Sequence, residues 1–429
     1  MDGRSGLIAV ACMAWALQAC EDVTVPPEAE VASAVPDDKV ARRILRASPL
    51  PPMPADPTNR VADDPDAVRL GHWLFFDERL SGTGTFSCAS CHDPAKGFAD
   101  GLPVAFAVGE GTRHTQSLLN VGHHRWIGWD GRSDSLWSQA LRPMEHPAEM
   151  AGDRLAIARL FGEDPRLRAA YEGVFGALPV DVSGLPEHGR PGKDEALAAA
   201  WDSIDPETQQ AIMEMMANIG KAIAAYQRKL ENRDAPFDRY VEALREKTPV
   251  DGIMSPEAEA GMNLFFGRAE CWECHAGPLF SDGEFHNIGI PPRGGGLPRD
   301  AGRFMGARIV KADPFNAAGT FSDASEGPWA TTVRQTRIDP ETWGAFKTPS
   351  LRGVEKTAPY MHAGQFQTLE EVIDFYSTLE GAVQLDHHQQ EVLQPLNLTG
   401  EEARDLAAFL RSMSGKPLPG DLLRPPREP

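Results

Sequence analysis

Two short motifs constrain this chain more than any other feature of its sequence. Each contains two cysteines three positions apart, followed at once by a histidine: Cys88-Ala-Ser-Cys91-His92 and Cys271-Trp-Glu-Cys274-His275. Cysteines at this spacing can bond to the two vinyl groups of one haem, and the adjacent imidazole can then bind the haem iron. Structural zinc sites also use paired cysteines, but they do not require a histidine directly after each pair. The motifs therefore predict two covalently bound haem c groups, with His92 and His275 as iron ligands.

The remaining cysteines lie in a segment typical of export signals. Only Cys12 and Cys20 fall outside the two motifs. The apolar run Leu7–Leu17 is too short to span a bilayer, as in a removable signal peptide. Leu17-Gln18-Ala19-Cys20 resembles a bacterial lipobox, and an ordinary cleaved signal is the alternative. We therefore expect residues 1–19 to be a signal peptide of the lipoprotein type, with a lipid anchor at Cys20 and a mature protein in the periplasm.

Composition favours a helical protein with long loops. The chain has 429 residues, 41% of them hydrophobic, which is enough for a core and for two domains. Runs of the strand-favouring residues Val, Ile and Tyr are scarce. The formal net charge is −20, which disfavours binding to nucleic acid or to anionic membranes. After the N-terminal segment, no stretch approaches the roughly 18 apolar residues that a membrane span requires.

The sequence around the two motifs is duplicated. Gly71-His-Trp-Leu-Phe-Phe76 precedes the first motif, and Gly261-Met-Asn-Leu-Phe-Phe266 precedes the second. In both cases a capping residue followed by proline predicts the start of a helix, at Asp64-Pro65 and at Ser255-Pro256. A further helix is expected to close each half. The first is Gln209–Leu230, and the second begins with a capping box at Thr399 and Glu402 and stops at Gly415.

These repeats predict a mainly α fold with two cytochrome c-like haem domains in tandem. We expect the N-terminal domain at residues 61–248 and the C-terminal domain at residues 249–416. Residues 20–60 are rich in proline and are expected to form an extended linker without a core of its own. Residues 417–429 are expected to be a tail.

From Leu74 to Gly415 the sequence resembles the bacterial di-haem cytochrome c peroxidase and MauG family. The following segments, in this order, carry the resemblance: Trp129-Asp-Gly-Arg132, Gln139, Pro143-Met144, Pro147-Ala-Glu149-Met150, Phe346-Lys-Thr-Pro-Ser-Leu-Arg352, Ala358-Pro-Tyr-Met-His362 and Tyr376. The resemblance implies an enzyme that reacts with hydrogen peroxide at the first haem and passes electrons through the second.

The resemblance also implies roles for three residues near the first haem. Peroxide chemistry needs an open iron site and a group that moves a proton between the two peroxide oxygens. Glu149 and Gln139 match the family's distal acid and the amide beside it. Trp129 matches an indole that carries electrons between the haems. No histidine or methionine occurs in residues 93–113, and so we expect the first iron to be open without prior reduction.

The sixth ligand of the second haem separates the branches of the family. Peroxidases of the family have methionine at the position seven residues after the leucine of Thr-Leu-Glu-Glu, whereas MauG-type enzymes have tyrosine. In this chain the leucine is Leu369, and the residue seven positions after it is Tyr376. A phenolate favours oxidised iron, and a thioether favours ferrous iron. We therefore expect Tyr376 as the ligand, with Met361 as the alternative.

A departure from the family pattern concerns calcium. The family's Arg-Asn-Thr-Pro segment is Arg113-His-Thr-Gln116 in this chain. The resemblance implies a calcium ion between the haems, bound by that asparagine and by carbonyls that match Thr357 and Pro359. Calcium prefers oxygen ligands, and histidine is a poor substitute. The ion is expected either to be absent or to take a water molecule in place of the side chain.

We expect a periplasmic enzyme that uses hydrogen peroxide to oxidise a residue of a partner protein, as MauG does. The main alternative is a cytochrome c peroxidase that takes electrons from a small cytochrome or cupredoxin. A third hypothesis is an electron-transfer cytochrome without catalysis. Glu149 and the absence of a ligand in residues 93–113 argue against it, because a pure carrier would cap both irons.

Overall fold

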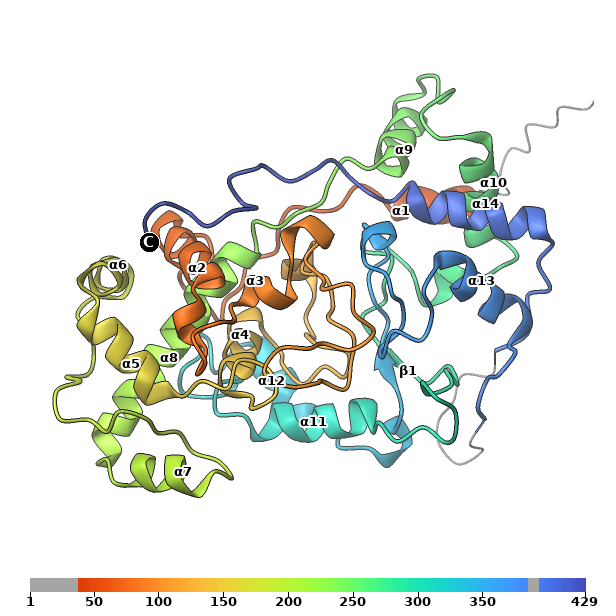
Figure 1. Cartoon of the computed structure of the whole chain (residues 1–429). Coiled ribbons are helices and arrows are strands. Elements are labelled where there is room, and N and C mark those ends of the chain that lie inside the picture. Colours follow the sequence, from red (N-terminus) through yellow and green to blue (C-terminus); the bar gives the residue numbers. More distant parts are fainter. Residues whose placement is uncertain (1–37, 385–392) are drawn as a thin grey trace, which may run out of the picture. The chain divides into compact units, whose positions relative to one another are not determined.

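The computed structural model describes residues 38–384 and 393–429 (Figure 1). The expected signal peptide and Cys20 lie outside the described residues. The α-helices are α1 (Asp38–Arg46), α2 (Pro65–Phe76), α3 (Cys88–Cys91), α4 (Leu136–Glu145), α5 (Arg154–Glu163), α6 (Pro165–Phe175), α7 (Glu195–Asp202), α8 (Pro206–Gln227), α9 (Pro236–Glu246), α10 (Pro256–Phe266), α11 (Gly302–Ala312), α12 (Pro328–Gln335), α13 (Leu369–Thr378) and α14 (Gly400–Arg411). Short 3-10 turns are η1 (Glu78–Leu80), η2 (Pro94–Lys96), η3 (Val121–His123), η4 (Cys271–Glu273), η5 (Pro340–Thr342) and η6 (Val354–Lys356). Strands β1 (Phe285–His286) and β2 (Phe346–Lys347) form one antiparallel pair. The mainly α prediction is confirmed.

The duplicated helices each pack against the helix that closes their half of the chain. Helix α2 packs on α8, and α10 packs on α14 (Figure 1). The repeated glycine allows this approach, because a Cβ at Gly71 would lie 1.8 Å from the carbonyl oxygen of Ala222. A Cβ at Gly261 would lie 2.0 Å from the carbonyl oxygen of Asp405. The two halves therefore use the same backbone-to-backbone helix contact.

The helix starts follow the capping signals in the sequence. The side chain of Asp64 accepts hydrogen bonds from the backbone of α2, and that of Ser255 accepts one from the backbone of α10. Thr399 and Glu402 form a capping box at the start of α14. These side chains satisfy backbone N–H groups that have no partner within the helix.

Two hydrophobic cores lie under these helices. The first surrounds α2, α4 and α8 and includes the fully buried Trp137 and Tyr226. The second surrounds α10 and α14 and includes a cluster of phenylalanines, among them Phe265 and Phe409. The cores cross the expected boundary near residue 248. Helix α9 contributes Phe237 to the second core, whereas Phe315 joins the first.

The described part of the expected linker is ordered by packing. Helix α1 buries Ile44 against the second core, so this segment contains a helix where an extended chain is expected. Arg233 then donates to the carbonyl oxygens of Leu50 and Pro51 at 2.6 Å each. Apolar side chains and arginine donors thus fix a proline-rich segment whose composition alone favours an extended linker.

The C-terminal tail runs back to the first core. Leu422 packs against that core, and its carbonyl oxygen accepts a hydrogen bond of 2.6 Å from the Tyr226 hydroxyl. Among the described residues, no helix is both long enough and apolar enough to cross a membrane.

Candidate functional site

A connected cavity of about 1530 Å³ reaches both cysteine motifs. Its lining includes all six motif residues that the sequence predicts to attach haem: Cys88, Cys91, His92, Cys271, Cys274 and His275. None of the four cysteines forms a disulfide. The volume exceeds the roughly 300–1,000 Å³ of a typical small-molecule pocket, as two large groups would require.

The two histidines are oriented in the same way by a phenylalanine carbonyl. His92 Nδ1 lies 3.0 Å from the carbonyl oxygen of Phe98, and His275 Nδ1 lies 2.8 Å from that of Phe280. Both phenylalanines have left-handed backbones, with φ of 60° and 52°. A carbonyl only accepts, so Nδ1 carries the proton and the Nε2 lone pair is left for a metal. Burial lowers the pKa of both imidazoles, which favours the neutral form that binds iron.

A repeated Thr-x-Ser-Leu segment supports these phenylalanines. Ser117 donates to the carbonyl oxygen of Gly97 at 2.6 Å, and Ser350 donates to that of Leu279 at 2.6 Å. In each case the acceptor is the residue directly before the phenylalanine. Sequence reasoning missed this support. The match between Thr115-Gln-Ser-Leu118 and Thr348-Pro-Ser-Leu351 is the signal that would have found it.

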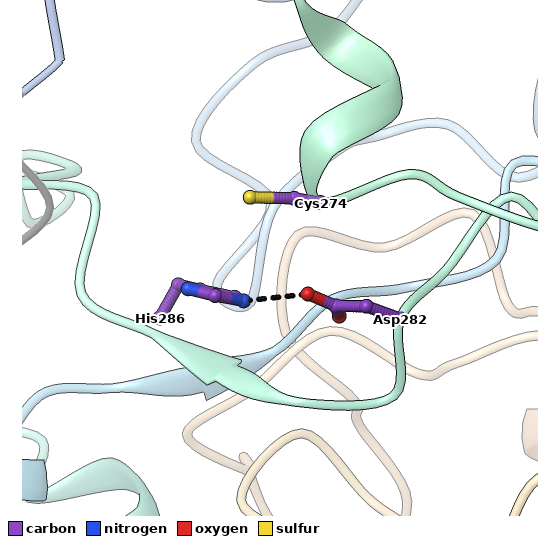
Figure 2. A group of neighbouring side chains, drawn as sticks. All are labelled: Cys274, Asp282 and His286. Atoms are coloured by element: carbon purple, nitrogen blue, oxygen red, sulfur yellow. Dashed lines mark hydrogen bonds and ion pairs between the residues drawn. The ribbon is translucent and has the colours of Figure 1, made fainter.

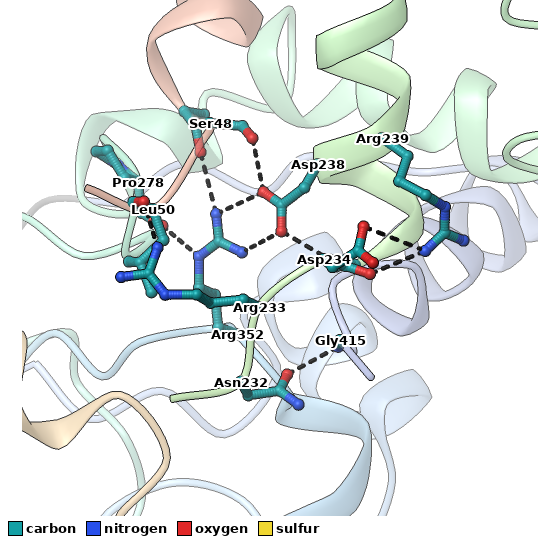
Figure 3. A network of polar contacts seen from close by, with 12 residues as sticks. Ser48, Leu50, Asn232, Arg233, Asp234, Asp238, Arg239, Pro278, Arg352 and Gly415 are labelled. Carbon is teal, nitrogen blue, oxygen red and sulfur yellow. Dashed lines mark hydrogen bonds and ion pairs between the residues drawn. The ribbon is translucent and has the colours of Figure 1, made fainter. Parts of the chain in front are cut away.

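A second support is specific to the C-terminal motif. Arg352 donates to the carbonyl oxygen of Pro278 and, at 2.9 Å each, to both carboxylate oxygens of Asp238. Ser48 donates to the same carboxylate at 2.6 Å (Figure 3). The segment before α2 and helix α9 thereby hold the loop that leads to Phe280.

One group of side chains beside the second motif has the spacing of a metal site. Figure 2 shows His286 and Asp282 facing one another, with Nε2 and Oδ2 2.8 Å apart and the Cys274 sulfur beside them. Cys274 is also a haem-attachment cysteine. A thioether to haem would remove the thiolate that a separate ion needs, so this group belongs to the surroundings of the second haem.

Trp129 is held rigidly in the wall of the same cavity. Its Nε1 donates to the carbonyl oxygen of His114 at 2.9 Å, and its own carbonyl oxygen accepts from the backbone of Lys347 at 2.7 Å. The ring is edge-on to His362, with centroids 6.5 Å apart. Trp129 thus contacts one segment that follows the first motif and another that follows the second. An electron relay between two haems would need such a position.

A buried ion-pair network lies next to Trp129. Asp130 is fully buried and pairs with Arg132 and Arg113, and Arg113 also pairs with Asp300. Burial alone would raise the pKa of Asp130, but Arg132 and Arg113 outweigh it and the pKa is lowered. Because Asp300 comes from the second half of the chain, the network joins the two halves beside the tryptophan.

Glu149 and Gln139 both line the cavity. Burial, with the nearby carboxylates of Asp100 and Glu149, raises the pKa of the Cys91 thiol to about 11. His146, three residues before Glu149, has its Nδ1 3.4 Å from a carboxylate oxygen of that side chain. Sequence reasoning missed His146, although the spacing of three residues was a usable signal.

Tyr376 and Met361 both line the cavity. Burial, followed by the charges of Cys271 and Cys274, raises the pKa of Tyr376. Met361 sits on a left-handed turn with φ of 69°. The arrangement brings both ligand candidates to the wall of one cavity.

The residues matched to the calcium site also line the cavity. These are Thr357 and Pro359, beside His114. The His114 Nδ1 is 2.7 Å from the carbonyl oxygen of Leu102, so this nitrogen is used within the protein. Among the described residues, the only cluster of three acidic, histidine or cysteine side chains with ion-binding spacing is the group around Cys274.

The residues present are suited to two haem groups. Four thiols outside any disulfide, two imidazoles whose Nδ1 faces a carbonyl, and a large connected cavity are the features that covalent haem requires. The fold and the site together define a c-type cytochrome with two haem sites.

Comparison with known proteins identifies the family. The family model for di-haem cytochrome c peroxidase matches residues 65–246. Cytochrome-c peroxidase IdrP1 of Denitromonas iodatirespirans is 33% identical over 85% of each chain. The methylamine utilization protein MauG of Methylorubrum extorquens is 30% identical over 94% of this chain and 95% of its own. A crystal structure of a MauG-like protein associated with microbial copper homeostasis has 26% identity and a TM-score of 0.61, covering 88% of this chain and 98% of its own. The chain belongs to the di-haem cytochrome c peroxidase and MauG family of haem oxidoreductases.

Proposed function

We propose that this protein uses hydrogen peroxide to oxidise a residue of a partner protein, as a MauG-like enzyme. The observation that carries the proposal is the position of Tyr376 in the wall of the cavity that also contains Cys271, Cys274 and His275. A phenolate ligand on the second iron stabilises its oxidised form. Oxidising equivalents can then be retained until a large partner arrives.

The residues on the side of the first motif have complementary roles in this proposal. Bound haem supplies an iron that reacts with peroxide and stores oxidising equivalents. Glu149 moves a proton between the two peroxide oxygens, and Gln139 orients the Glu149 carboxylate. His146, 3.4 Å from Glu149, is placed to exchange that proton with solvent because its side chain is half exposed.

Trp129 connects the two haem sites in this proposal. The hydrogen bonds to His114 and from Lys347 fix the indole at both its ring nitrogen and its backbone. A rigid aromatic group keeps the electron path short and constant. An electron from the partner residue can thus reach the first haem site through Trp129, even when the partner docks away from that site.

A cytochrome c peroxidase is the second candidate function. It is favoured by Met361, which lines the same cavity, and by the similarity to proteins named cytochrome-c peroxidase. In that case a small cytochrome or cupredoxin would supply the electrons. The two candidates share hydrogen peroxide and two haems and differ in the ligand of the second iron.

We further propose export to the periplasm with a lipid anchor at Cys20, because c-type haem is attached there. We propose that the calcium ion of the family is either absent here or takes a water molecule in place of the side chain. A bound ion would have to rely on the carbonyl oxygens of Thr357 and Pro359 together with water, since His114 offers a nitrogen in place of an oxygen.

The experiment that tests the proposal compares wild type with Tyr376→Met. Steady-state oxidation of a reduced small cytochrome by peroxide should be slow in wild type and faster in the variant. The reason is that a thioether raises the potential of the second haem and favours electron entry. A Phe375→Leu variant, altered at the adjacent buried side chain, is the control and should behave as wild type. Fast turnover in wild type that Tyr376→Met leaves unchanged would favour the peroxidase candidate.

A further inference from the structure

Six basic residues line the cavity, and one of them lacks the partner that a buried charge requires. They are Arg113, Arg132, Arg293, Arg299, Lys347 and Arg352. Arg113 and Arg132 pair with Asp130, and Arg352 pairs with Asp238. Arg293 and Arg299 are exposed to solvent. Lys347 is only 5% exposed, and its amino group makes no hydrogen bond or ion pair within the described residues.

A buried ammonium group without a partner is costly. Transfer of a charge out of water is unfavourable unless hydrogen bonds or a counter-charge replace the lost solvation. Burial lowers the pKa of Lys347 to about 8, and Asp282 opposes this only through its charge at a distance. An anion in the cavity would remove this cost.

The backbone of Lys347 is fixed in the wall of the cavity that reaches both motifs. In β2 it pairs antiparallel with Phe285 of β1, and its N–H donates to the carbonyl oxygen of Trp129 at 2.7 Å. Thr348, the next residue, starts the segment that supports Phe280 and His275. Lys347 is therefore placed by the same elements that position Trp129 and the second motif.

We propose that the amino group of Lys347 binds a carboxylate of a haem held in this cavity. Each covalent haem keeps two propionate carboxylates, which are the anions that the expected cofactors bring to this wall. The carboxylate can come from the haem of either motif, and the experiment below separates these sources. The inference depends on haem occupancy and is independent of the reaction proposed above.

The contact has a measurable electrostatic consequence. A cation beside a haem carboxylate offsets its negative charge and favours the reduced iron. Loss of the ammonium group should shift the reduction equilibrium of that haem towards the ferric state by about tenfold. For a one-electron couple, this corresponds to a fall in midpoint potential of about 59 mV.

The test is potentiometric titration of the di-haem protein in three variants. Lys347→Met should lower the potential of one haem by about that amount, and Lys347→Arg should stay near wild type because it keeps the charge. Lys229→Met, which removes an exposed lysine at the end of α8, is the matched control and should cause no shift. Unchanged potentials in Lys347→Met, with both haems attached, would overturn the proposal. So would an equal shift in Lys347→Arg.

Single-haem proteins identify the source of the carboxylate. Lys347→Met is combined with Cys88→Ala and Cys91→Ala, and separately with Cys271→Ala and Cys274→Ala. If Lys347→Met still lowers the potential in one single-haem protein, the haem that this protein retains is the one that contacts Lys347. If the potential falls in neither protein, the contact is contradicted. If Lys347→Met does not fold, a structure of haem-loaded wild type decides the matter. An Nζ within about 2.7–3.2 Å of a propionate oxygen supports the proposal, and an Nζ without a carboxylate neighbour overturns it.

Discussion

The ion pair between Arg352 and Asp238 allows a quantitative test of how the second haem motif is supported. The two side chains are 1% and 11% exposed, and two hydrogen bonds of 2.9 Å join them. Asp238→Asn keeps the shape of the side chain but leaves the buried guanidinium without its counter-charge. Removing one partner of a buried pair costs about 3–5 kcal/mol. We expect Asp238→Asn to lower the free energy of unfolding by about that amount.

The effect should depend on pH in a defined direction. Burial would raise the pKa of Asp238, but Arg352 outweighs it and the pKa falls below the ordinary value of 3.8. A group whose pKa is lowered by folding contributes stability above its unfolded pKa and loses it as the pH falls through the folded pKa. The difference in stability between wild type and Asp238→Asn should therefore be full at neutral pH and shrink below about pH 4.

Urea unfolding of the oxidised di-haem protein, followed by circular dichroism, measures this cost. The matched control is Asp234→Asn, because Asp234 pairs with Arg239 (Figure 3) and is 37% exposed. Asp234 also pairs with the exposed Lys416. Exposed pairs contribute at most about 1 kcal/mol. If Asp238→Asn costs no more than this control, the Arg352 network does not support the second motif as described here.

Three further outcomes are expected. Replacing Cys88 and Cys91 by alanine should remove one covalent haem and leave the second, and an intact mass with two haems would contradict the attachment sites. Glu149→Gln should keep both haems but slow the reaction with peroxide by about 10²-fold in stopped-flow mixing, the usual scale for loss of a general acid–base. An unchanged rate would assign proton transfer to another residue. Peptide mass spectrometry of the mature protein should find an acylated N-terminus at Cys20, whereas an unmodified start at another residue would leave a plain signal peptide.

The sequence predicts those parts of the fold that depend on local signals. Asp64-Pro65 and Ser255-Pro256 start the expected helices because capping and proline geometry act within one turn. The repeated glycines at 71 and 261 mark the close helix contacts because only glycine permits them. The Cys-x-x-Cys-His motifs likewise contain the attachment chemistry within five residues.

The remaining features depend on contacts between distant segments. The left-handed backbones of Phe98 and Phe280 carry no local signal, since phenylalanine rarely adopts that conformation. The composition of residues 20–60 is typical of a linker, and only the packing of Ile44 and the donors of Arg233 order its described part. The cavity position of Lys347 follows from pairing with β1 and with Trp129, which are far away in the sequence.

The near-infrared absorption spectrum of the oxidised wild-type protein tests the central claim most directly. Ligation of the second iron by Tyr376 predicts that no sulfur-to-iron charge-transfer band is present and that this band appears in Tyr376→Met. A sulfur-to-iron band in the wild type would instead show a methionine ligand, with Met361 as the candidate in the cavity wall. That result would contradict the MauG-like assignment and favour a cytochrome c peroxidase.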